Sequence, residues 1–185
     1  MEHKLTIPCT AADLAGFHAG DTVLLSGIVY TARDQAHKRM ADALDAGEPL
    51  PFDLQGSAIY YVGPTPERPG QVIGSAGPTT SGRMDAFSSR LLDLGNLVMI
   101  GKGKRSDAVK EAVVRNGAVY LAALGGAGAL MAQCVMELEI IAWPDLGCEA
   151  VRKLLVEDMP LTVVLDPYGG DLYESGPKAY LDSTL

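Results

Sequence analysis

Apolar residues occur along the chain in short runs that alternate with stretches of mixed polarity. Residues 22–31 (TVLLSGIVYT) are rich in apolar and β-branched side chains, which predicts a buried strand. Over residues 34–46 apolar side chains recur on one face at helical spacing, and Gly47 follows, which predicts a helix that ends there. A strand followed by a helix is the first unit of an α/β pattern.

The same alternation is predicted through the middle of the chain. Short strands are expected over 57–62, 71–73, 97–100 and 118–123, and the Pro- and Gly-rich segment 64–70 is expected to turn. Helices are expected over 83–94, where apolar residues recur every three or four positions before Gly95, and between Ser106 and Gly117. Residues 124–133 (LGGAGALMAQ) lead into a further short helix.

From Val135 onward the pattern is that of strands. We predict three strands, over 135–143, 150–159 and 161–170, and irregular surface structure after Tyr173. Strands that alternate with helices and are framed by further strands predict a single α/β domain over 1–185, with a mixed central sheet and flanking helices.

Composition narrows the class of protein. The chain has 185 residues, 48% of them apolar and 21% charged, and a formal net charge of −8. These values are typical of a globular domain and exclude an intrinsically disordered one. A net acidic chain is a poor partner for nucleic acid. No apolar run approaches the roughly 20 residues that cross a bilayer, and the N-terminal residues lack the apolar core of a signal peptide, so we expect no membrane partner and a cytoplasmic location.

Cysteine and histidine usage does not predict a metal site in this chain. The three cysteines, Cys9, Cys134 and Cys148, form no CxxC pair and stand far apart, which favours a reducing compartment and buried thiols. His3, His18 and His37 have no spacing typical of a ligand set. Nucleotide motifs also fail, because GKGKRS does not match a P-loop and Met131 interrupts a dinucleotide pattern.

Three predicted strands end by delivering a cation into a polar or glycine-rich turn. The cations are Arg33, Arg83 and the group Lys102, Lys104 and Arg105. Ligands of open α/β sheets bind at the carboxyl ends of strands, so these turns predict a small cationic pocket for an anionic substrate if they meet. The alternative is that each is a surface cation near the start of a helix.

The segment GPTTSGR (residues 77–83) carries hydroxyl groups to the start of a predicted helix. The hydroxyls of Thr79 and Thr80 stand where exposed N–H groups attract carboxylate or phosphate. The alternative role for Thr80 or Ser81 is to cap the helix. His37 follows Arg33 by four residues and shares a helical face with it; it is either a proton carrier or a hydrogen-bonding residue that holds the helix.

Four motifs give the chain a family resemblance. LSGIVYTARDQAHKRM, GPTTSGRMD, GKGKRS and GGAGALMAQ occur in this order between about Asp21 and Leu165. Together they resemble the β-subunit, or C-terminal domain, of the class I iron–sulfur fumarate hydratases and their L-tartrate dehydratase relatives. GRMD with KGKRS is more similar to the fumarate hydratase branch.

The resemblance implies a swivelling β/β/α domain that works in a hetero-oligomer with an α-subunit, whose cysteines hold a 4Fe-4S cluster. Carried over by motif, Arg33, Thr79, Arg83 and Lys102 are the substrate-binding set, with Lys104 as the competing lysine. Thr79 resembles the family's base at the substrate carbon, and His37 matches the motif histidine as a second catalytic candidate. The implied activity is reversible hydration of fumarate to (S)-malate, a step of the tricarboxylic acid cycle.

Cations at these positions suit that chemistry. Fumarate and malate are small dianions, and an arginine grips a carboxylate with two parallel hydrogen bonds. A threonine base needs a neighbour such as Lys102 or Arg83 to stabilise its alkoxide. Two other functions stay open: L(+)-tartrate dehydration to oxaloacetate, with mesaconate as a further substrate to assay, and a stand-alone anion-binding domain without catalysis.

Overall fold

A single mixed sheet organises the chain in the computed structural model, which describes residues 1–184. Its strands are β1 (Glu2–Ile7), β2 (Thr22–Thr31), β3 (Ala58–Tyr60), β4 (Val98–Gly101), β5 (Val119–Ala122), β6 (Val135–Ala142) and β7 (Val151–Leu165). Strands β1 to β5 pair in parallel with their neighbours, whereas β7 is antiparallel to β2, β5 and β6. The predicted mixed sheet is therefore confirmed.

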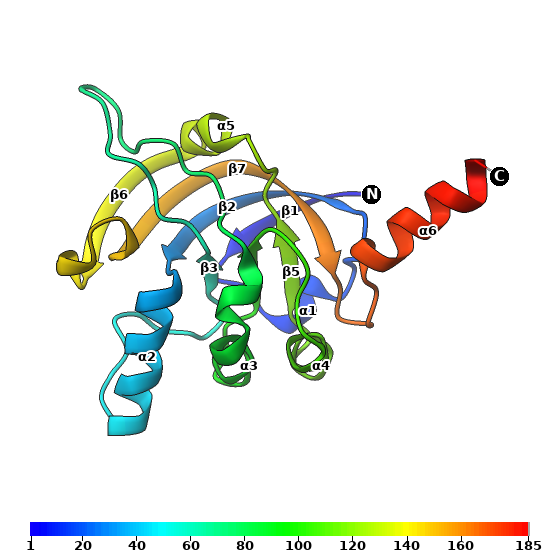
Figure 1. Ribbon diagram of the computed structural model, residues 1–185, viewed down its shortest axis with the longest axis horizontal. Helices are drawn as coiled ribbons and strands as arrows, with labels where there is room; N and C mark the ends of the chain where they lie inside the picture. The colour runs from blue at the N-terminus through cyan, green and yellow to red at the C-terminus, as the bar shows by residue number, and fades with distance from the viewer. Residues whose placement is uncertain (185) are drawn as a thin grey trace.

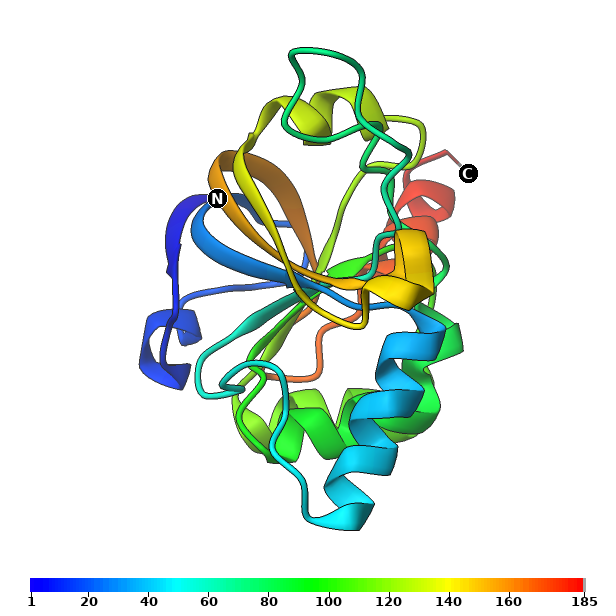
Figure 2. The ribbon, with the colours of Figure 1, turned by 90° about the vertical axis from the view of Figure 1, so that its left-hand side faces the viewer.

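The sheet closes on itself. In the order β2, β3, β4, β5 and β7 each strand pairs with the next, and β7 pairs back onto β2 from Thr22↔Thr162 to Thr31↔Arg152. Strand β1 extends the sheet beyond β2, and β6 extends it beyond β7. Figures 1 and 2 show β6 and β7 as an arch over the parallel strands.

One helical layer covers the outside of the parallel strands. It consists of α2 (Asp34–Ala46), α3 (Asp85–Asp93) and α4 (Asp107–Asn116), which hang side by side below the sheet in Figure 1. The remaining helices are α1 (Ala11–Leu14), α5 (Gly128–Gln133), α6 (Leu172–Thr184) and the 3₁₀ turns η1 (Ser81–Met84) and η2 (Pro144–Glu149). None of the helices described here is long and apolar enough to span a membrane.

The strands have buried residues on both faces because each face meets a different core. Ala58 and Tyr60 of β3 point into the core enclosed by the closed sheet, while Ile59 points to the core beneath the helices. Strands β4 and β5 divide in the same way, as the period of two requires. This explains why the strands read as continuous apolar runs in the sequence.

The helix predicted over 34–46 is confirmed with both ends, and Gly47 ends it in the left-handed conformation. The helix expected over 83–94 begins instead as the 3₁₀ turn η1 and becomes α-helical at Asp85. The helix after Ser106 and the strands near 97–100 and 118–123 are confirmed within a residue or so.

Three predictions of secondary structure are wrong. Residues 71–73 form no strand, because they belong to a loop that folds tightly on itself: a Cβ on Gly74 would stand 2.1 Å from the Thr65 carbonyl oxygen. The two strands expected over 150–159 and 161–170 are one strand, β7. Pro160 does not end it, because a register shift in the β2–β7 pairing and the positive φ of Asp158 accommodate the irregularity.

The tail after Tyr173 is also not irregular, because it forms α6. The side chain of Asp171 accepts a hydrogen bond from the Tyr173 amide, and its carbonyl accepts one from Ser175, so the helix has a start signal. Leu172 and Tyr173 pack against the core beneath the helices. The rest of α6 projects away from the body in Figure 1.

Candidate functional site

The carboxyl ends of β2, β3 and β4 meet at one edge of the sheet. Beyond the strands, backbone hydrogen bonds continue from the Ala32 amide to Tyr60 (3.1 Å) and from the Tyr61 amide to Ile100 (2.9 Å). The Thr79 amide donates to the Tyr61 carbonyl at 2.8 Å, which brings the GPTTSGR segment to the same edge. The turns predicted to carry cations therefore lie next to one another.

The turn after β4 lies directly beside the threonines. Thr80 and Lys102 form a parallel bridge, and the Ser81 amide donates to the Lys102 carbonyl at 2.9 Å. The side chains of Thr79 and Lys102 are half-buried, and within residues 1–184 no other side chain engages them. Lys104 is exposed further along the turn. A hydroxyl and an ammonium are thus uncommitted at adjoining positions.

The two candidate arginines are each held by a carboxylate from another segment. Arg33 Nη2 lies 3.5 Å from Glu149 Oε1, and Arg83 Nη1 lies 3.6 Å from Asp34 Oδ2. Both separations exceed a normal N–H···O hydrogen bond, so the carboxylates restrain the guanidinium groups without occupying their donors fully. The Arg83–Asp34 contact also joins the turn after β2 to the turn before α3.

Unpartnered polar atoms gather on one turn of this edge. Within residues 1–184, the buried side-chain atoms without a hydrogen-bond partner are Arg33 Nε, Asp34 Oδ1 and His37 Nε2. A buried polar atom normally has a partner, and leaving one unpaired costs about 1–3 kcal/mol. All three atoms lie on residues at the start of α2, next to the turn that carries the Arg33 guanidinium.

His37 is fully buried beneath the turn. Its Nδ1 donates to the Arg33 carbonyl at 3.0 Å, which leaves Nε2 as the unprotonated nitrogen. Its ring packs edge-on against Tyr61, with centroids 5.3 Å apart. Burial, opposed by the hydrogen bond to Arg33 and aided by the charge of Arg105, lowers the pKa of His37 from 6.5 to about 4. The histidine is therefore neutral at physiological pH.

Two glycines permit the close packing at this edge. A Cβ on Gly101 would stand 1.9 Å from Ser81 Oγ, and one on Gly63 would stand 2.9 Å from Arg33 Nη1. A side chain at Gly101 would displace the Ser81 hydroxyl, and one at Gly63 would push the Arg33 side chain aside, so both glycines suit the packing observed at this edge.

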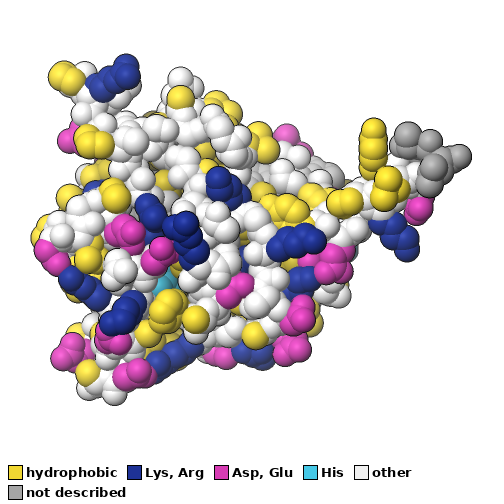
Figure 3. All heavy atoms as spheres, in the orientation of Figure 1, with side chains coloured by type: hydrophobic (Ala, Val, Ile, Leu, Met, Phe, Trp, Pro, Cys, Tyr) yellow, Lys and Arg dark blue, Asp and Glu magenta, His cyan; other side chains and the backbone are white. Residues whose placement is uncertain are grey.

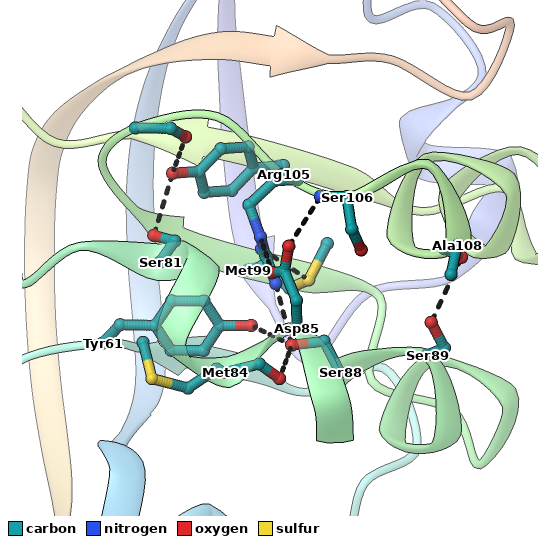
Figure 4. Close-up of polar contacts among 12 residues, drawn as sticks. Tyr61, Ser81, Met84, Asp85, Ser88, Ser89, Met99, Arg105, Ser106 and Ala108 are labelled. Atoms are coloured by element: carbon teal, nitrogen blue, oxygen red, sulfur yellow. Dashed lines mark hydrogen bonds and ion pairs between the residues drawn. The ribbon is translucent and has the colours of Figure 1, made fainter.

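Two expectations about individual residues are wrong. Arg105 is not a pocket cation: its side chain is 0% exposed and pairs with Asp85 at 2.7 Å (Figure 4). Neither Thr80 nor Ser81 caps a helix with its side chain; the Ser81 hydroxyl instead accepts hydrogen bonds from the Lys102 amide (3.0 Å) and the Tyr120 hydroxyl (2.9 Å). Ser81 is therefore a buried connector between the two turns.

The roles of the two carboxylates at the site, Asp34 and Glu149, are not predictable from the sequence. Asp34 lies within the TARD segment, but no local pattern indicates that it pairs with Arg83. Glu149 comes from η2, far along the chain, and its Oε2 also accepts a hydrogen bond from the Gln35 amide at 3.0 Å. No local pattern links Glu149 to Arg33, so only the folded chain shows the contact.

Charge on the surface follows this arrangement. Figure 3 shows Lys and Arg side chains gathered with Asp and Glu over the region where α2 and α3 begin.

A cavity of about 440 Å³ lies elsewhere, between the 65–75 loop and α5, and is lined by residues such as Arg68, Val72 and Ala132. Arg33, Thr79, Arg83 and Lys102 do not line it.

The cysteines are free, with Cys9 buried, Cys134 half-buried and Cys148 exposed. In the described part of the chain no three His, Cys, Asp or Glu side chains are grouped so that they could hold a metal ion. The residues present therefore do not fit an iron–sulfur cluster, which needs several thiolates at one place.

A mixed α/β domain that gathers cations and hydroxyls at one sheet edge is suited to binding a small anion. In a comparison with known protein families, the family model described as Fumarase C-terminus matches residues 2–176 of this chain. The chain belongs to this family, whose members found here are hydro-lyases.

Its relatives include proteins about three times as long as the matched span and one that the matched span nearly fills. The chain is 40% identical over 179 residues to "Fumarate hydratase 2" of Leishmania major, covering 94% of this chain and 31% of the relative. It is 38% identical over 165 residues to "Fumarate hydratase class I, anaerobic" of Escherichia coli strain K12, covering 88% and 30%. It is 32% identical over 187 residues to "L(+)-tartrate dehydratase subunit beta" of the same strain, covering 98% and 92%. The chain thus spans about a third of the fumarate hydratases that it matches.

Proposed function

We propose that this chain is the β-subunit of an iron–sulfur hydro-lyase that interconverts fumarate and (S)-malate in the cytoplasm. The proposal rests on the convergence of Arg33, Thr79, Arg83 and Lys102 at the carboxyl ends of β2, β3 and β4. Hydro-lyase relatives along the whole matched span support it.

The cations have the number and placement that a dianion needs. Arg33 and Arg83 each bind one or both oxygens of a substrate carboxylate, and Lys102 supplies a third charge. Hydrogen bonds to charged groups contribute about 1.5–3 kcal/mol each. Because Glu149 and Asp34 hold the arginines only loosely, the substrate carboxylates complete the hydrogen bonding of the guanidinium groups.

Thr79 handles the proton at the substrate carbon. Hydration of fumarate adds a proton to one carbon and hydroxide to the other, and the reverse step removes both. In the reverse direction the Thr79 oxygen takes the proton from carbon, which requires an alkoxide that a neighbouring cation stabilises. Lys102 follows β4 directly beside the threonines and fills this role more directly than the exposed Lys104.

His37 acts through Arg33. A neutral imidazole that donates to the Arg33 carbonyl fixes the turn that carries the guanidinium. We therefore propose a positioning role for His37 in place of proton transfer.

This chain is half of an active site in the proposal. The 4Fe-4S cluster sits on an α-subunit, as the family resemblance implies, and the described residues of this chain form no group of three His, Cys, Asp or Glu that could hold a metal ion. Residues 1–185 act as one swivelling β/β/α domain that presents its cationic edge to that subunit. A relative named as a β-subunit supports the partnership.

A second substrate has a specific observation in its favour. The aligned span covers 92% of the E. coli L(+)-tartrate dehydratase β-subunit, and tartrate is also a small dianion. The alternative function is therefore dehydration of L(+)-tartrate to oxaloacetate with the same residues.

The test is co-expression with the class I α-subunit of the same organism under anaerobic conditions, followed by assays on fumarate, L(+)-tartrate and mesaconate. Fumarate turnover well above the others is expected; preferential tartrate turnover would establish the alternative. An inactive complex together with tight dicarboxylate binding by the isolated chain, measured by calorimetry, would instead indicate a non-catalytic anion-binding domain.

Substitution Thr79→Val removes the proton-handling oxygen. Turnover is expected to fall by about 10²–10⁴-fold, the range for loss of a general acid or base. Thr80→Val is the matched control, since Thr80 is adjacent and its hydroxyl caps no helix. Near-normal turnover in Thr79→Val would remove this residue from the mechanism.

A further inference from the structure

Arg105 is a buried arginine beneath the candidate site. Its Nε donates to Asp85 Oδ1 at 2.7 Å, its Nη2 to Ser88 Oγ at 2.8 Å, and its Nη1 contacts Met99 Sδ at 3.3 Å. The guanidinium also lies 5.3 Å from the centre of the Tyr61 ring and 4.9 Å from that of Tyr120. Because every side of the group is engaged, no substrate reaches it (Figure 4).

The partners of Arg105 belong to the two turns that carry the candidate residues. Asp85 is the first residue of α3, two positions after Arg83, and its other oxygen accepts a hydrogen bond from the Ser106 amide. Ser88 donates to the Met84 carbonyl at 2.9 Å. The ion pair therefore ties the GRMD turn to the end of GKGKRS.

A second set of bonds fixes the same two turns above the ion pair. Lys102 is bonded to Ser81 through both its amide (3.0 Å, to Oγ) and its carbonyl (2.9 Å, from the Ser81 amide). The Gly103 amide donates to the Tyr173 hydroxyl of α6 at 2.8 Å. Arg83 and Lys102 are thus carried on turns that cannot shift independently while the buried network is intact.

A buried ion pair is weak evidence for a contribution to stability, since apolar residues of similar volume often replace such a pair without loss. An apolar replacement cannot reproduce the fixed hydrogen-bond geometry of the guanidinium, because this planar group sets the distances to three partners at once. The ion pair lies directly under the two turns, so its fixed geometry can set how far apart the turns lie.

We propose that Arg105, through Asp85 and Ser88, is a positioning residue that sets the spacing between Arg83 and Lys102 for a dicarboxylate. This inference rests on the proposed function and assigns the KGKRS arginine a role without substrate contact.

The test uses Arg105→Lys in the complex with the α-subunit. Lysine keeps the charge and can still pair with Asp85, but it cannot also reach Ser88 and Met99. A displacement of about 1 Å at a site can cost 10²-fold in rate, so kcat/KM is expected to fall by about 100-fold. The KM is expected to rise, because Arg83 and Lys102 would no longer be spaced to bind both carboxylates. A variant that merely lowers the folded fraction would reduce the apparent kcat and leave KM unchanged, so the change in KM distinguishes the two effects.

Arg115→Lys is the matched control. Arg115 also joins α4 to α3, through Asp93 at 2.7 and 2.8 Å, but at the far ends of the helices and at the surface. Its kinetics are expected to equal those of the unsubstituted complex. Normal KM and kcat in a folded Arg105→Lys complex would overturn the proposal.

A measurement independent of turnover separates this inference from the proposed function. In hydrogen–deuterium exchange of the isolated chain, the Ser81 and Lys102 amides are expected to exchange on the order of tenfold faster in Arg105→Lys, and unchanged in Arg115→Lys. Unchanged exchange in both variants would refute the positioning role. Faster exchange in Arg105→Lys alone would support it, even if the complex turned over none of the three diacids.

Discussion

The buried, neutral His37 makes the stability of the chain depend on pH in a calculable way. The pKa is 6.5 in the unfolded chain and about 4 in the folded one, because burial opposes the charged form. Between pH 4 and pH 6.5, His37 is therefore protonated in the unfolded chain and neutral in the folded chain. The free energy of unfolding is therefore highest above pH 6.5 and falls on acidification towards pH 4. One pKa unit corresponds to about 1.4 kcal/mol, so His37 alone should cost about 2 kcal/mol between pH 7 and pH 5.

The perturbation that isolates this effect is His37→Asn. The asparagine amide can donate to the Arg33 carbonyl where Nδ1 does now, but it does not titrate. Any cavity left by the smaller side chain lowers stability equally at every pH, so the slope is the informative quantity. Denaturant unfolding at several values between pH 7 and pH 5 gives the free energy directly.

The variant is expected to lose about 2 kcal/mol less than the unsubstituted chain over this interval. His18→Asn serves as the control, because His18 is exposed, and its slope should match the unsubstituted chain. Parallel curves for His37→Asn and the unsubstituted chain would refute the argument from burial.

Two further predictions concern the site edge. Gly101→Ala forces a Cβ against Ser81 Oγ, so we expect about 1–3 kcal/mol of destabilisation in a thermal or denaturant melt. Gly82→Ala, whose Cβ would meet Lys104 at an ordinary 3.6 Å, should change the melt little, and equal melts for the two variants would contradict the close contact. Arg33→Lys keeps the charge and loses the planar fork, so kcat/KM of the complex with the α-subunit should fall about 10- to 100-fold. Unaltered kinetics would exclude Arg33 as a carboxylate ligand.

Local patterns predicted those elements whose cause is local. The helix over 34–46 has its apolar face and its terminating Gly47 within one segment, so both ends were predictable. By contrast, β7 reads as two strands around Pro160, and only pairing with β2 shows that it continues. The start of α6 depends on Asp171 and on packing of Leu172, neither of which is visible as a periodic pattern in the tail.

The candidate site also has features that a sequence rule predicts and features that only the folded chain shows. The rule that parallel strands end together accounts for Arg33 and Lys102, which follow β2 and β4. It does not account for Thr79 and Arg83, because the strand expected before them does not form and their segment reaches the edge through backbone contacts with Tyr61 and Lys102. The rule does not say which cation of GKGKRS turns inward; Arg105 does, because Asp85 and two tyrosine rings are there to receive it. Roles in substrate binding and proton transfer stay predictions until the complex is assayed.

Closure of the sheet by β7 has a consequence for synthesis of the chain on the ribosome. Thr22 of β2 pairs with Thr162, so about 140 further residues must be made before this edge is covered. At about 5–20 residues per second, the nascent β2 waits roughly 7–28 s with an open backbone edge. Strand β1 pairs on the other side of β2, so until β7 is made this edge stays open to pairing with a neighbouring chain.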